Sequence, residues 1–326
     1  MMRNRITTLR CVAALLMACA GGAATAQAKF PTAPIRMLVG TPAGGTTDVI
    51  ARLIAARMSQ SLSQSVVVEN RTGASGLIAA ESVAKASADG YTVLMASSQL
   101  ATYRALYAAT RLEPEKDLEP LGIVATSPYV MVVHPSLPVK TLPELIAYAK
   151  ANPGKISYAG SSPGTAQHLG WELIKTKAGV DMQYVPYKGT GALMPDLLAG
   201  RLQAGIDNVA ILTPYIKSGQ LRGVAVTSPA RTPLLPDLPT VAASGVPDFQ
   251  AMGWFGVFAT GKAPPQALAA LRSAVRSAMA APEVREKLVG MGAEPQSGDP
   301  AELRGLLKRE STVWSKVIKD NHISAP

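Results

Sequence analysis

The chain has 326 residues, a formal net charge of +10 at pH 7, 17% charged residues and 5% aromatic residues. This length exceeds what a single hydrophobic core usually spans, so we expect more than one lobe. The basic residues are scattered and aromatic residues are few, which argues against nucleic acid as a partner. The surplus positive charge is either a solvated basic surface or a mild field that favours anionic ligands.

The N-terminal segment has the pattern of a secretory signal peptide. Three arginines in the first ten residues precede an apolar run, Cys11–Ala20, and small residues with Ala-x-Ala sites continue to Ala28. The apolar run is shorter than the roughly 20 residues that span a bilayer, so we expect cleavage that removes residues 1–28, and export to the periplasm. The alternative is a lipid attached at Cys19, whose flanking residues loosely match a lipoprotein signal.

The mature chain offers little for metal or cofactor chemistry. Both cysteines lie in the leader, so no disulfide, thiolate nucleophile or thiolate metal site is expected. The three histidines are dispersed and no H-E-x-x-H motif occurs. Neither the G-x-x-x-x-G-K-[ST] loop nor the G-x-G-x-x-G fingerprint of nucleotide sites is present. We therefore expect no cofactor and no metal.

The mature chain begins with alternating strands and helices. Apolar and β-branched runs predict strands at 35–39, 66–68 and 91–95. Apolar residues at helical spacing predict a helix at 46–62, and a second helix is expected at 77–86. Strand–helix alternation at such short spacing is typical of βαβ units and predicts a mostly parallel sheet.

A second alternating series starts near Pro128. Its expected strands are 129–133, 156–159, 183–187 and 224–226. Its expected helices run from Thr141 to the Asn152-Pro153-Gly154 stop, from 165 to 176 and from 192 to 199. A proline-rich loop at 228–239 and a strand at 254–259 lead into three C-terminal helical segments. Because those helices have few strand partners of their own, we expect them to pack on the sheet of the first lobe.

These series predict two α/β lobes. Residues 29–127 and 249–326 would form lobe 1, and residues 128–248 would form lobe 2. The chain would cross between them near Ser127-Pro128 and near Phe249–Gly253. Two crossings make a hinge with a cleft, and clefts between domains are preferred ligand sites.

The first candidate site is the loop Thr41-Pro42-Ala43-Gly44-Gly45-Thr46-Thr47-Asp48, between the first strand and its helix. Its paired glycines permit a sharp turn and a close approach of the backbone to a ligand. Thr46 or Thr47 can cap the helix, and the free N–H groups at the helix start form a seat for an anion. The alternative is an ordinary capped turn in which Asp48 only complements the helix dipole.

The second candidate site is the loop Gly160-Ser161-Ser162-Pro163-Gly164-Thr165, which again joins a strand to a helix. Small residues, hydroxyl groups and a helix N-terminus repeat the chemistry of the first loop. The two loops would face each other across the cleft, and each could hold one end of a small acid. His168, one turn into the helix, is either a plain helix-face residue or a further ligand contact.

The second loop also contains the G-x-S-x-G pattern of a nucleophile elbow, so an exported serine hydrolase using Ser162 is the rival hypothesis. However, Pro163 follows the candidate nucleophile and has no N–H to donate to an oxyanion hole. None of the three histidines is well placed in the sequence to act as the general base for Ser162. His134 precedes a proline, His168 lies in the adjacent helix and His322 is in the tail. We therefore expect a protein that is not an enzyme.

Motifs along the whole mature chain resemble those of the Bug family of extracytoplasmic solute receptors, the binding proteins of tripartite tricarboxylate transporters. The matching segments are Thr41-Pro42-Ala43-Gly44-Gly45-Thr46-Thr47-Asp48-Val49-Ile50-Ala51-Arg52, Val67-Val68-Glu69-Asn70-Arg71, Ala88-Asp89-Gly90-Tyr91-Thr92, Val185-Pro186-Tyr187-Lys188-Gly189, Asp207-Asn208, Ala225-Val226-Thr227-Ser228, Leu238-Pro239-Thr240-Val241, Pro282-Glu283-Val284-Arg285 and Gly292-Ala293-Glu294-Pro295. They occur in order and at consistent spacing, so chance is a poor explanation.

The resemblance implies an α/β fold of the type II periplasmic-binding-protein class that closes over its ligand. It also implies that the two loops hold a ligand carboxylate, largely through backbone N–H groups and bridging waters. Carried onto this sequence, the contacting residues are Ala43, Gly44, Gly45, Thr46 and Asp48, then Ser161, Ser162, Gly164 and Thr165. Further walls of the cleft are Ser97, Ser98, Asp207 and Asn208.

The sequence departs from the family pattern just before the glycine pair. The family commonly has an aromatic residue and a proline there, whereas this chain has Gly40-Thr41. Loss of the ring should enlarge or polarise the pocket, so the identity of the ligand does not carry over. Ligands in the family range over citrate-like acids, dicarboxylates, acidic amino acids and aromatic acids.

The sequence therefore predicts a periplasmic receptor that captures a small organic carboxylate and delivers it to a tripartite tricarboxylate-type transporter. The carboxylate would be a di- or tricarboxylate, an acidic amino acid or an aromatic acid. The expected partners are this ligand and the membrane subunits of the transporter, and we expect a monomer. A sensory receptor that feeds a signalling partner is an alternative that the sequence leaves open.

Overall fold

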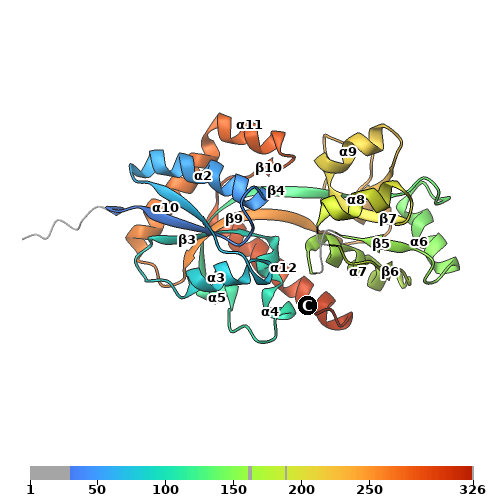
Figure 1. The fold of residues 1–326 in the computed structure, drawn as a ribbon, viewed down its shortest axis with the longest axis horizontal. Coiled ribbons are helices and arrows are strands. Elements are labelled where there is room, and N and C mark those ends of the chain that lie inside the picture. The colour runs from blue at the N-terminus through green and yellow to red at the C-terminus, as the bar shows by residue number, and fades with distance from the viewer. Residues whose placement is uncertain (1–29, 161–163, 188, 325–326) are drawn as a thin grey trace, which may run out of the picture.

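The computed structural model describes residues 30–160, 164–187 and 189–324 (Figure 1). The expected leader with its two cysteines, and Ser161 and Ser162 of the second loop, lie outside these ranges. The molecule consists of two α/β lobes placed side by side along its longest axis, and two long strands run from one lobe into the other (Figure 1). None of the helices in the described part of the chain is both long and apolar enough to cross a membrane.

Lobe 1 is built on a twisted sheet with helices on both faces. Its strands, in spatial order, are β2 (Val66–Asn70), β1 (Ile35–Val39), β3 (Thr92–Ser97), β9 (Met252–Thr260), β4 (Leu118–Val133) and β10 (Glu294–Pro295). The helices α2 (Thr46–Leu62), α10 (Pro265–Ala280) and α11 (Pro282–Gly290) cover one face, and α3 (Leu77–Ala84) and α12 (Pro300–Asp320) cover the other (Figure 1). Alternate side chains of β1 enter the two cores, Met37 towards α2 and Leu38 towards α3.

Lobe 2 repeats this layered arrangement on a smaller sheet. Its strands are the second half of β4 with β8 (Arg222–Val226), β7 (Ala204–Asn208), β5 (Ser157–Ala159) and β6 (Gln183–Tyr184). Its helices are α6 (Leu142–Ala151), α7 (Ala166–Ala178), α8 (Thr190–Leu198) and α9 (Val209–Lys217). Val130 and Val132 of β4 point towards α8 and α9, whereas Met131 and Val133 point towards α6 and α7.

Short elements complete lobe 1 and fill the connections. They are η1 (Ala74–Gly76), η2 (Ser98–Ala101), α4 (Tyr103–Leu106), α5 (Pro114–Asp117) and, in lobe 2, η3 (Ala242–Ser244). The η2 turn follows β3 directly, so it brings the residues after that strand to the edge of the sheet that faces lobe 2.

The strand β4 changes partners where the lobes meet. It pairs with β9 as far as Pro128, and from Tyr129 and Val130 onward it pairs with β7 and β8. The strand β9 carries the chain back in the opposite direction, and Met252 lies opposite Pro128. The two crossings therefore lie side by side. The exact lobe boundaries, at 127/128 and 248/249, stay a prediction.

The expected parallel pairing is confirmed for the first series, in which β1 pairs with β2 and β3, but the sheet as a whole is mixed. The pairs β1–β2, β1–β3, β5–β6 and β5–β7 are parallel, but every pair that involves β4 or β9 is antiparallel. The reason is topological. Because β4 leaves lobe 1 and β9 returns to it, the two crossing strands run against each other, and each also runs against the strand on its other side.

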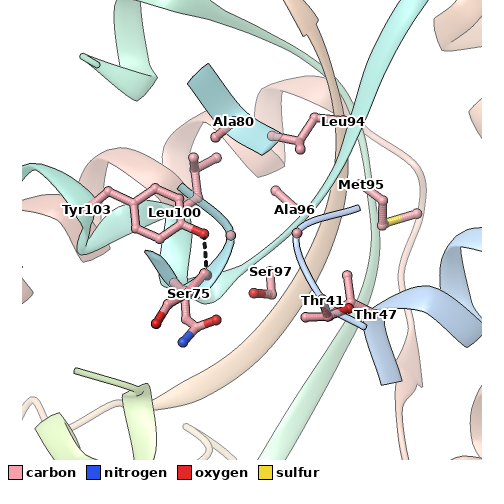
Figure 2. A pocket seen from close by; sticks show the side chains of 13 residues that line it. Thr41, Thr47, Ser75, Ala80, Leu94, Met95, Ala96, Ser97, Leu100 and Tyr103 are labelled. Carbon is pink, nitrogen blue, oxygen red and sulfur yellow. Dashed lines mark hydrogen bonds between the residues drawn. The ribbon is translucent and has the colours of Figure 1, made fainter. Parts of the chain in front are cut away.

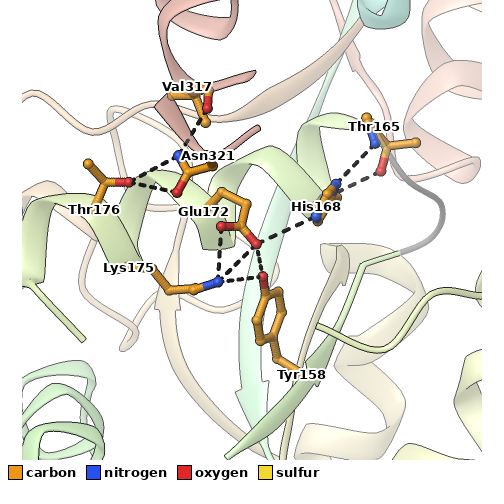
Figure 3. A network of polar contacts seen from close by, with 9 residues as sticks. Tyr158, Thr165, His168, Glu172, Lys175, Thr176, Val317 and Asn321 are labelled. Carbon is orange, nitrogen blue, oxygen red and sulfur yellow. Dashed lines mark hydrogen bonds and ion pairs between the residues drawn. The ribbon is translucent and has the colours of Figure 1, made fainter. Parts of the chain in front are cut away.

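The C-terminal helices pack on lobe 1 as expected, with one addition. Helix α12 covers β4 and η2 in lobe 1, but its end reaches α7 of lobe 2. There Asn321 and Thr176 exchange side-chain hydrogen bonds of 3.2 and 3.3 Å (Figure 3). Helix α12 therefore touches both lobes.

Candidate functional site

A cleft of about 350 Å³ lies between the lobes, next to both crossing strands. This volume falls in the range of pockets that bind small molecules. Lobe 1 contributes Thr41, Thr46, Thr47, Ser97, Ser98, Gln99 and Met291; lobe 2 contributes Thr165, Ala166, Gln167, Thr190, Asp207, Asn208 and Ile211; the crossing strands contribute Ser127, Tyr129, Gly253, Trp254 and Phe255. The lining is rich in hydroxyl and amide groups.

Four helices begin at this cleft. The N-caps of α2, α7, α8 and α9 are Gly45, Thr165, Gly189 and Asn208. The first turn of each helix lines the cleft. Backbone N–H groups in a first turn have no intrahelical acceptor, and the helix dipole adds partial positive charge there. Among the described residues that line the cleft, none is Arg or Lys, so the helix starts are the main source of positive potential on these walls.

Asp48 holds the first loop from behind. Its side chain is 2% exposed and is absent from the cleft lining. One carboxylate oxygen accepts the Gly44 N–H at 2.9 Å and the Arg52 Nε–H at 3.0 Å, and the other accepts Asn70 Nδ2 at 2.8 Å. The hydrogen bond from Arg52, which outweighs the effect of burial, lowers the pKa of Asp48 to about 2. Asp48 is thus an ionised anchor for the loop.

The start of α2 differs from the expected cap. Gly45 is the N-cap residue, and no side chain accepts a hydrogen bond at this position. The expected capping by Thr46 or Thr47 was therefore wrong. Asp48 instead accepts a hydrogen bond from the Gly44 N–H, which precedes the N-cap, and so fixes the backbone where it enters the helix. Both threonines line the cleft.

A second, much smaller cavity of about 10 Å³ lies behind the first loop (Figure 2). Thr41 lines both this cavity and the cleft, and its hydroxyl oxygen is buried without a hydrogen-bond partner among the described residues. The volume is large enough for about one water molecule. Thr41 thus places a polar group on this wall, and the effect of Gly40-Thr41 on the size of the ligand pocket stays a prediction.

Gly40 allows two backbone segments to approach closely at this cavity. A Cβ atom at Gly40 would lie 2.3 Å from the Cα atom of Gly76 in η1. No side chain can be added there without moving one segment. The contact fixes the first loop against the connection between β2 and α3.

His168 supports the second loop from within the protein. The Gly164 N–H donates to His168 Nδ1 at 3.0 Å, so this nitrogen carries no proton. The ring is 4% exposed, stacks on Tyr184 at 3.8 Å between centroids, and is absent from the cleft lining. Its Nε2 atom lies 3.6 Å from Glu172 Oε1. His168 thus positions the loop and does not line the cleft.

Glu172 anchors a polar network beneath this loop (Figure 3). Tyr158 donates its hydroxyl hydrogen to Glu172, and Lys175 Nζ lies 3.0 Å from Glu172 Oε2. Burial alone would raise the pKa of Glu172, but the hydrogen bonds from His168 and Tyr158 and the charge of Lys175 lower it to about 2. An ionised Glu172 therefore faces Nε2 of His168 and favours the tautomer that leaves Nδ1 free to accept.

Asp207 and Asn208 connect the starts of α8 and α9. The Thr190 hydroxyl donates to one Asp207 oxygen, and the Asn208 N–H donates to the other at 2.7 Å. Burial raises the pKa of Asp207 despite these hydrogen bonds. The Asn208 side-chain amide donates to Ser127 on β4 and its oxygen accepts the Ala210 N–H at 2.7 Å. The lobe 2 wall is therefore tied to a crossing strand.

The structure brings part of the expected site together. Of the expected residues, those that line the cleft are Thr46, Ser97, Ser98, Thr165, Asp207 and Asn208. The others are not part of the lining: Asp48, Gly164 and His168 are buried, Gly45 is half-buried, and Ala43 and Gly44 are exposed. Ser161 and Ser162 are outside the described residues. Direct ligand contact by any of them stays a prediction.

Several cleft residues had not been expected, among them Thr190, Gln167 and Trp254. Thr190 follows Gly189 at the start of a helix. Glycine followed by a hydroxyl residue at a helix start was the signal for the first two loops, and it also marks this third helix start. Tyr129 and Trp254 lie on the crossing strands. Their place next to the expected hinge was a usable signal that they would form the floor of the cleft.

A sequence model described as the tripartite tricarboxylate transporter family receptor, TctC, matches residues 50–323. The chain belongs to this receptor family. BugT of Bordetella pertussis is 37% identical over 97% of this chain and 98% of its own length. The predicted family is thereby confirmed.

Solved structures confirm the two-lobed fold of the receptor. The R. palustris protein Rpa4515 with adipate superimposes with a TM-score of 0.76 and 38% identity, over 91% of this chain and 100% of its own. The periplasmic binding protein BugD superimposes with a TM-score of 0.74 and 34% identity, over 91% of this chain and 100% of its own. The family is thus one of solute-binding receptors.

Proposed function

We propose that this receptor captures a small organic carboxylate in the cleft between its lobes and delivers it to a tripartite tricarboxylate-type membrane transporter. The observation that carries the proposal is the convergence of four helix N-termini on a cleft whose described lining holds no Arg or Lys. A helix start can bind a carboxylate through its free backbone N–H groups, so no Arg or Lys side chain is needed to balance the charge. The adipate bound to Rpa4515 is a ligand of this kind.

The arrangement of the walls favours a ligand with an acidic group at one or both ends. Thr46 and Thr47 stand at the lobe 1 helix start, and Thr165 and Gln167 stand at the facing one in lobe 2. Closing the lobes would bring both sets onto one molecule. We include di- and tricarboxylates, acidic amino acids and aromatic acids in the proposed class, since hydroxyl and amide groups accommodate all of them.

The protein acts as a binding receptor and not as an enzyme in this proposal. A serine hydrolase needs a histidine with one nitrogen directed at the nucleophile. The Nδ1 atom of His168 is occupied by Gly164, and its Nε2 atom faces Glu172. The ring is also buried away from the cleft. These contacts favour a structural role for His168 and support capture without turnover.

We further propose that the receptor works as a monomer in the periplasm after removal of residues 1–28. The pattern of the N-terminal sequence supports export. The family includes the periplasmic binding protein BugD, which supports the same compartment.

The test is a binding screen with matched ligand pairs. Leaderless protein is titrated with citrate, succinate, malate, adipate, glutamate and nicotinate, and with the corresponding neutral amides, by calorimetry and thermal shift. A ligand at 100 times its dissociation constant stabilises the fold by about 2.7 kcal/mol. We expect at least one acid to bind and its amide to fail. Binding of the neutral compounds alone would overturn the proposal.

A pair of variants tests binding in the cleft, and a third variant separates capture from catalysis. Ser98→Ala removes a hydroxyl that lines the cleft, whereas Thr312→Ala removes an exposed hydroxyl on α12. We expect only the first to weaken acid binding. Hydrolysis of ester substrates by the wild type, abolished by Ser162→Ala, would instead establish the hydrolase.

A further inference from the structure

A buried carboxyl group lies directly behind the floor of the cleft. Trp254, on the crossing strand β9, belongs to the cleft lining, but its side chain is fully buried, and its indole N–H donates to Glu310 Oε2 at 2.7 Å. Glu310 belongs to α12 and is 7% exposed. Burial of a carboxyl group is costly unless its oxygens are hydrogen-bonded. The Trp254–Glu310 hydrogen bond therefore fixes the indole ring against α12.

The surroundings of Glu310 are mostly apolar. Trp314, one turn further along α12, is 1% exposed and gives Glu310 a second side-chain hydrogen bond, and Trp254 packs against Phe258 with 6.3 Å between ring centroids. The charge acting on Glu310 from its own helix is that of Arg309. The ionisable group on the β4 side is Tyr129, whose pKa is raised by burial and by the carboxyl groups of Asp207 and Glu310.

Tyr129, which the Glu310 carboxyl group influences, is also part of the cleft floor. It lines the cleft on β4, and a Cβ atom at Gly253 would lie 2.5 Å from its hydroxyl oxygen. Gly253 precedes Trp254 on β9, so the two aromatic side chains lie at the point where the crossing strands pass each other. A change in the Glu310 carboxyl group therefore acts on two residues of the cleft floor.

Helix α12 extends this coupling beyond the floor. It packs on η2, which carries Ser98 and Gln99 of the lobe 1 wall. Its end bonds to Thr176 of α7, the helix whose first turn lines the lobe 2 wall. Glu310 lies midway along a helix that contacts both walls and the floor.

We propose that Glu310 is a positioning residue for ligand capture, which holds the buried Trp254 indole behind the cleft floor and thereby sets the affinity without touching the ligand. The inference rests on the proposed function of the cleft. It predicts that an acceptor at position 310 is required for full affinity. It also predicts that a negative charge there weakens the binding of an anion.

The test compares Glu310→Met, which removes the acceptor, with Glu310→Gln, which keeps an oxygen acceptor and removes the charge. The probe is the tightest binder among citrate, succinate, malate, adipate, glutamate and nicotinate. An unpaired indole N–H should weaken binding by about tenfold in Glu310→Met. Glu310→Gln should bind within about threefold of the wild type at pH 6, where burial, which raises the pKa of Glu310 to about 7, keeps the wild-type group neutral.

The pH profile distinguishes positioning from general damage to the fold. From pH 6 to pH 8 the wild-type affinity should fall several-fold as Glu310 ionises, whereas the affinity of Glu310→Gln should follow a flatter profile. Fluorine NMR of the fluorotryptophan-labelled protein reports the environment of Trp254, and we expect its resonance to move in Glu310→Met. Glu302→Gln, an exposed change on the same helix, is the control.

The outcomes are separable. Equal affinities and parallel pH profiles in the wild type and both Glu310 variants would overturn the positioning role while the receptor function stands. Failure of every acid on the wild type would overturn the receptor function itself. Loss of binding in Glu310→Met without rescue in Glu310→Gln at pH 6 would also contradict the inference.

Discussion

The ionisation of Glu310 predicts a measurable dependence of stability on pH. Burial raises its pKa to about 7 in the folded chain from an ordinary value of 4.5. Each pKa unit corresponds to about 1.4 kcal/mol, so the difference amounts to about 3 kcal/mol. Because the folded pKa is the higher one, this contribution is fully present below pH 4.5 and is lost as the pH rises through 7.

Glu310→Gln isolates this contribution. All other titrating groups are shared with the wild type, so they cancel in the difference between the two free energies of unfolding. At pH 4.5 the variant should be no more stable than the wild type, because both side chains are neutral. At pH 8 the variant should have gained about 3 kcal/mol relative to the wild type, because only the wild type then holds a buried charge.

The assay is urea unfolding of the leaderless proteins at several pH values between 4.5 and 8. Linear extrapolation gives the free energy of unfolding at each pH. Glu302→Gln, an exposed change on the same helix, serves as the control. A difference between Glu310→Gln and the wild type that does not change with pH would refute the reasoning.

Three further predictions concern the loops. Asp48→Asn should lower the free energy of unfolding at pH 7 by about 1 kcal/mol, since the paired arginine is half-exposed; this loss should vanish below pH 2, where the wild-type carboxylate is also protonated. His168→Leu leaves the Gly164 N–H without its acceptor and should weaken acid binding about tenfold by calorimetry. Gly40→Ala should lower the melting temperature by several degrees, whereas Gly191→Ala, with open space around it, should not.

Each of these predictions has a clear contrary result. An Asp48→Asn protein with wild-type stability at pH 7 would remove the anchoring role. Undiminished acid binding by His168→Leu would show that the second loop keeps its conformation without this hydrogen bond. Equal melting temperatures for the two alanine variants would mean that the backbone segments around Gly40 separate at little cost.

The helices were the most predictable part of the fold. The expected helix at 46–62 agrees with α2, because an apolar stripe at helical spacing faces a core that the same residues build. The strands of the crossings were less predictable. The first half of β4 contains Pro120 and Gly122, which signal a break, and the strand accommodates them with a shift of register. The strand β7, with Ala204-Gly205 at its start, lacks the β-branched run that marks a strand.

The candidate site was predicted in outline. Two helix starts could be identified from the sequence, because glycine, hydroxyl-bearing and acidic residues are typical of a turn between a strand and a helix. The roles of individual residues depended on tertiary contacts. Asp48 lies behind its loop because Arg52 and Asn70 hold it there, and His168 is buried because Tyr184 stacks on it. Asn70 and Tyr184 lie outside the two loops and their helices, so these two partners are not apparent from the loop motifs alone.

The most direct test of carboxylate capture is a crystal structure of the leaderless receptor with the tightest acid from the screen. We predict closed lobes, with the carboxylate oxygens about 3 Å from main-chain N–H groups at the starts of α2 and α7. A ligand bound elsewhere, or one whose carboxylate points away from these helix starts, would contradict the account.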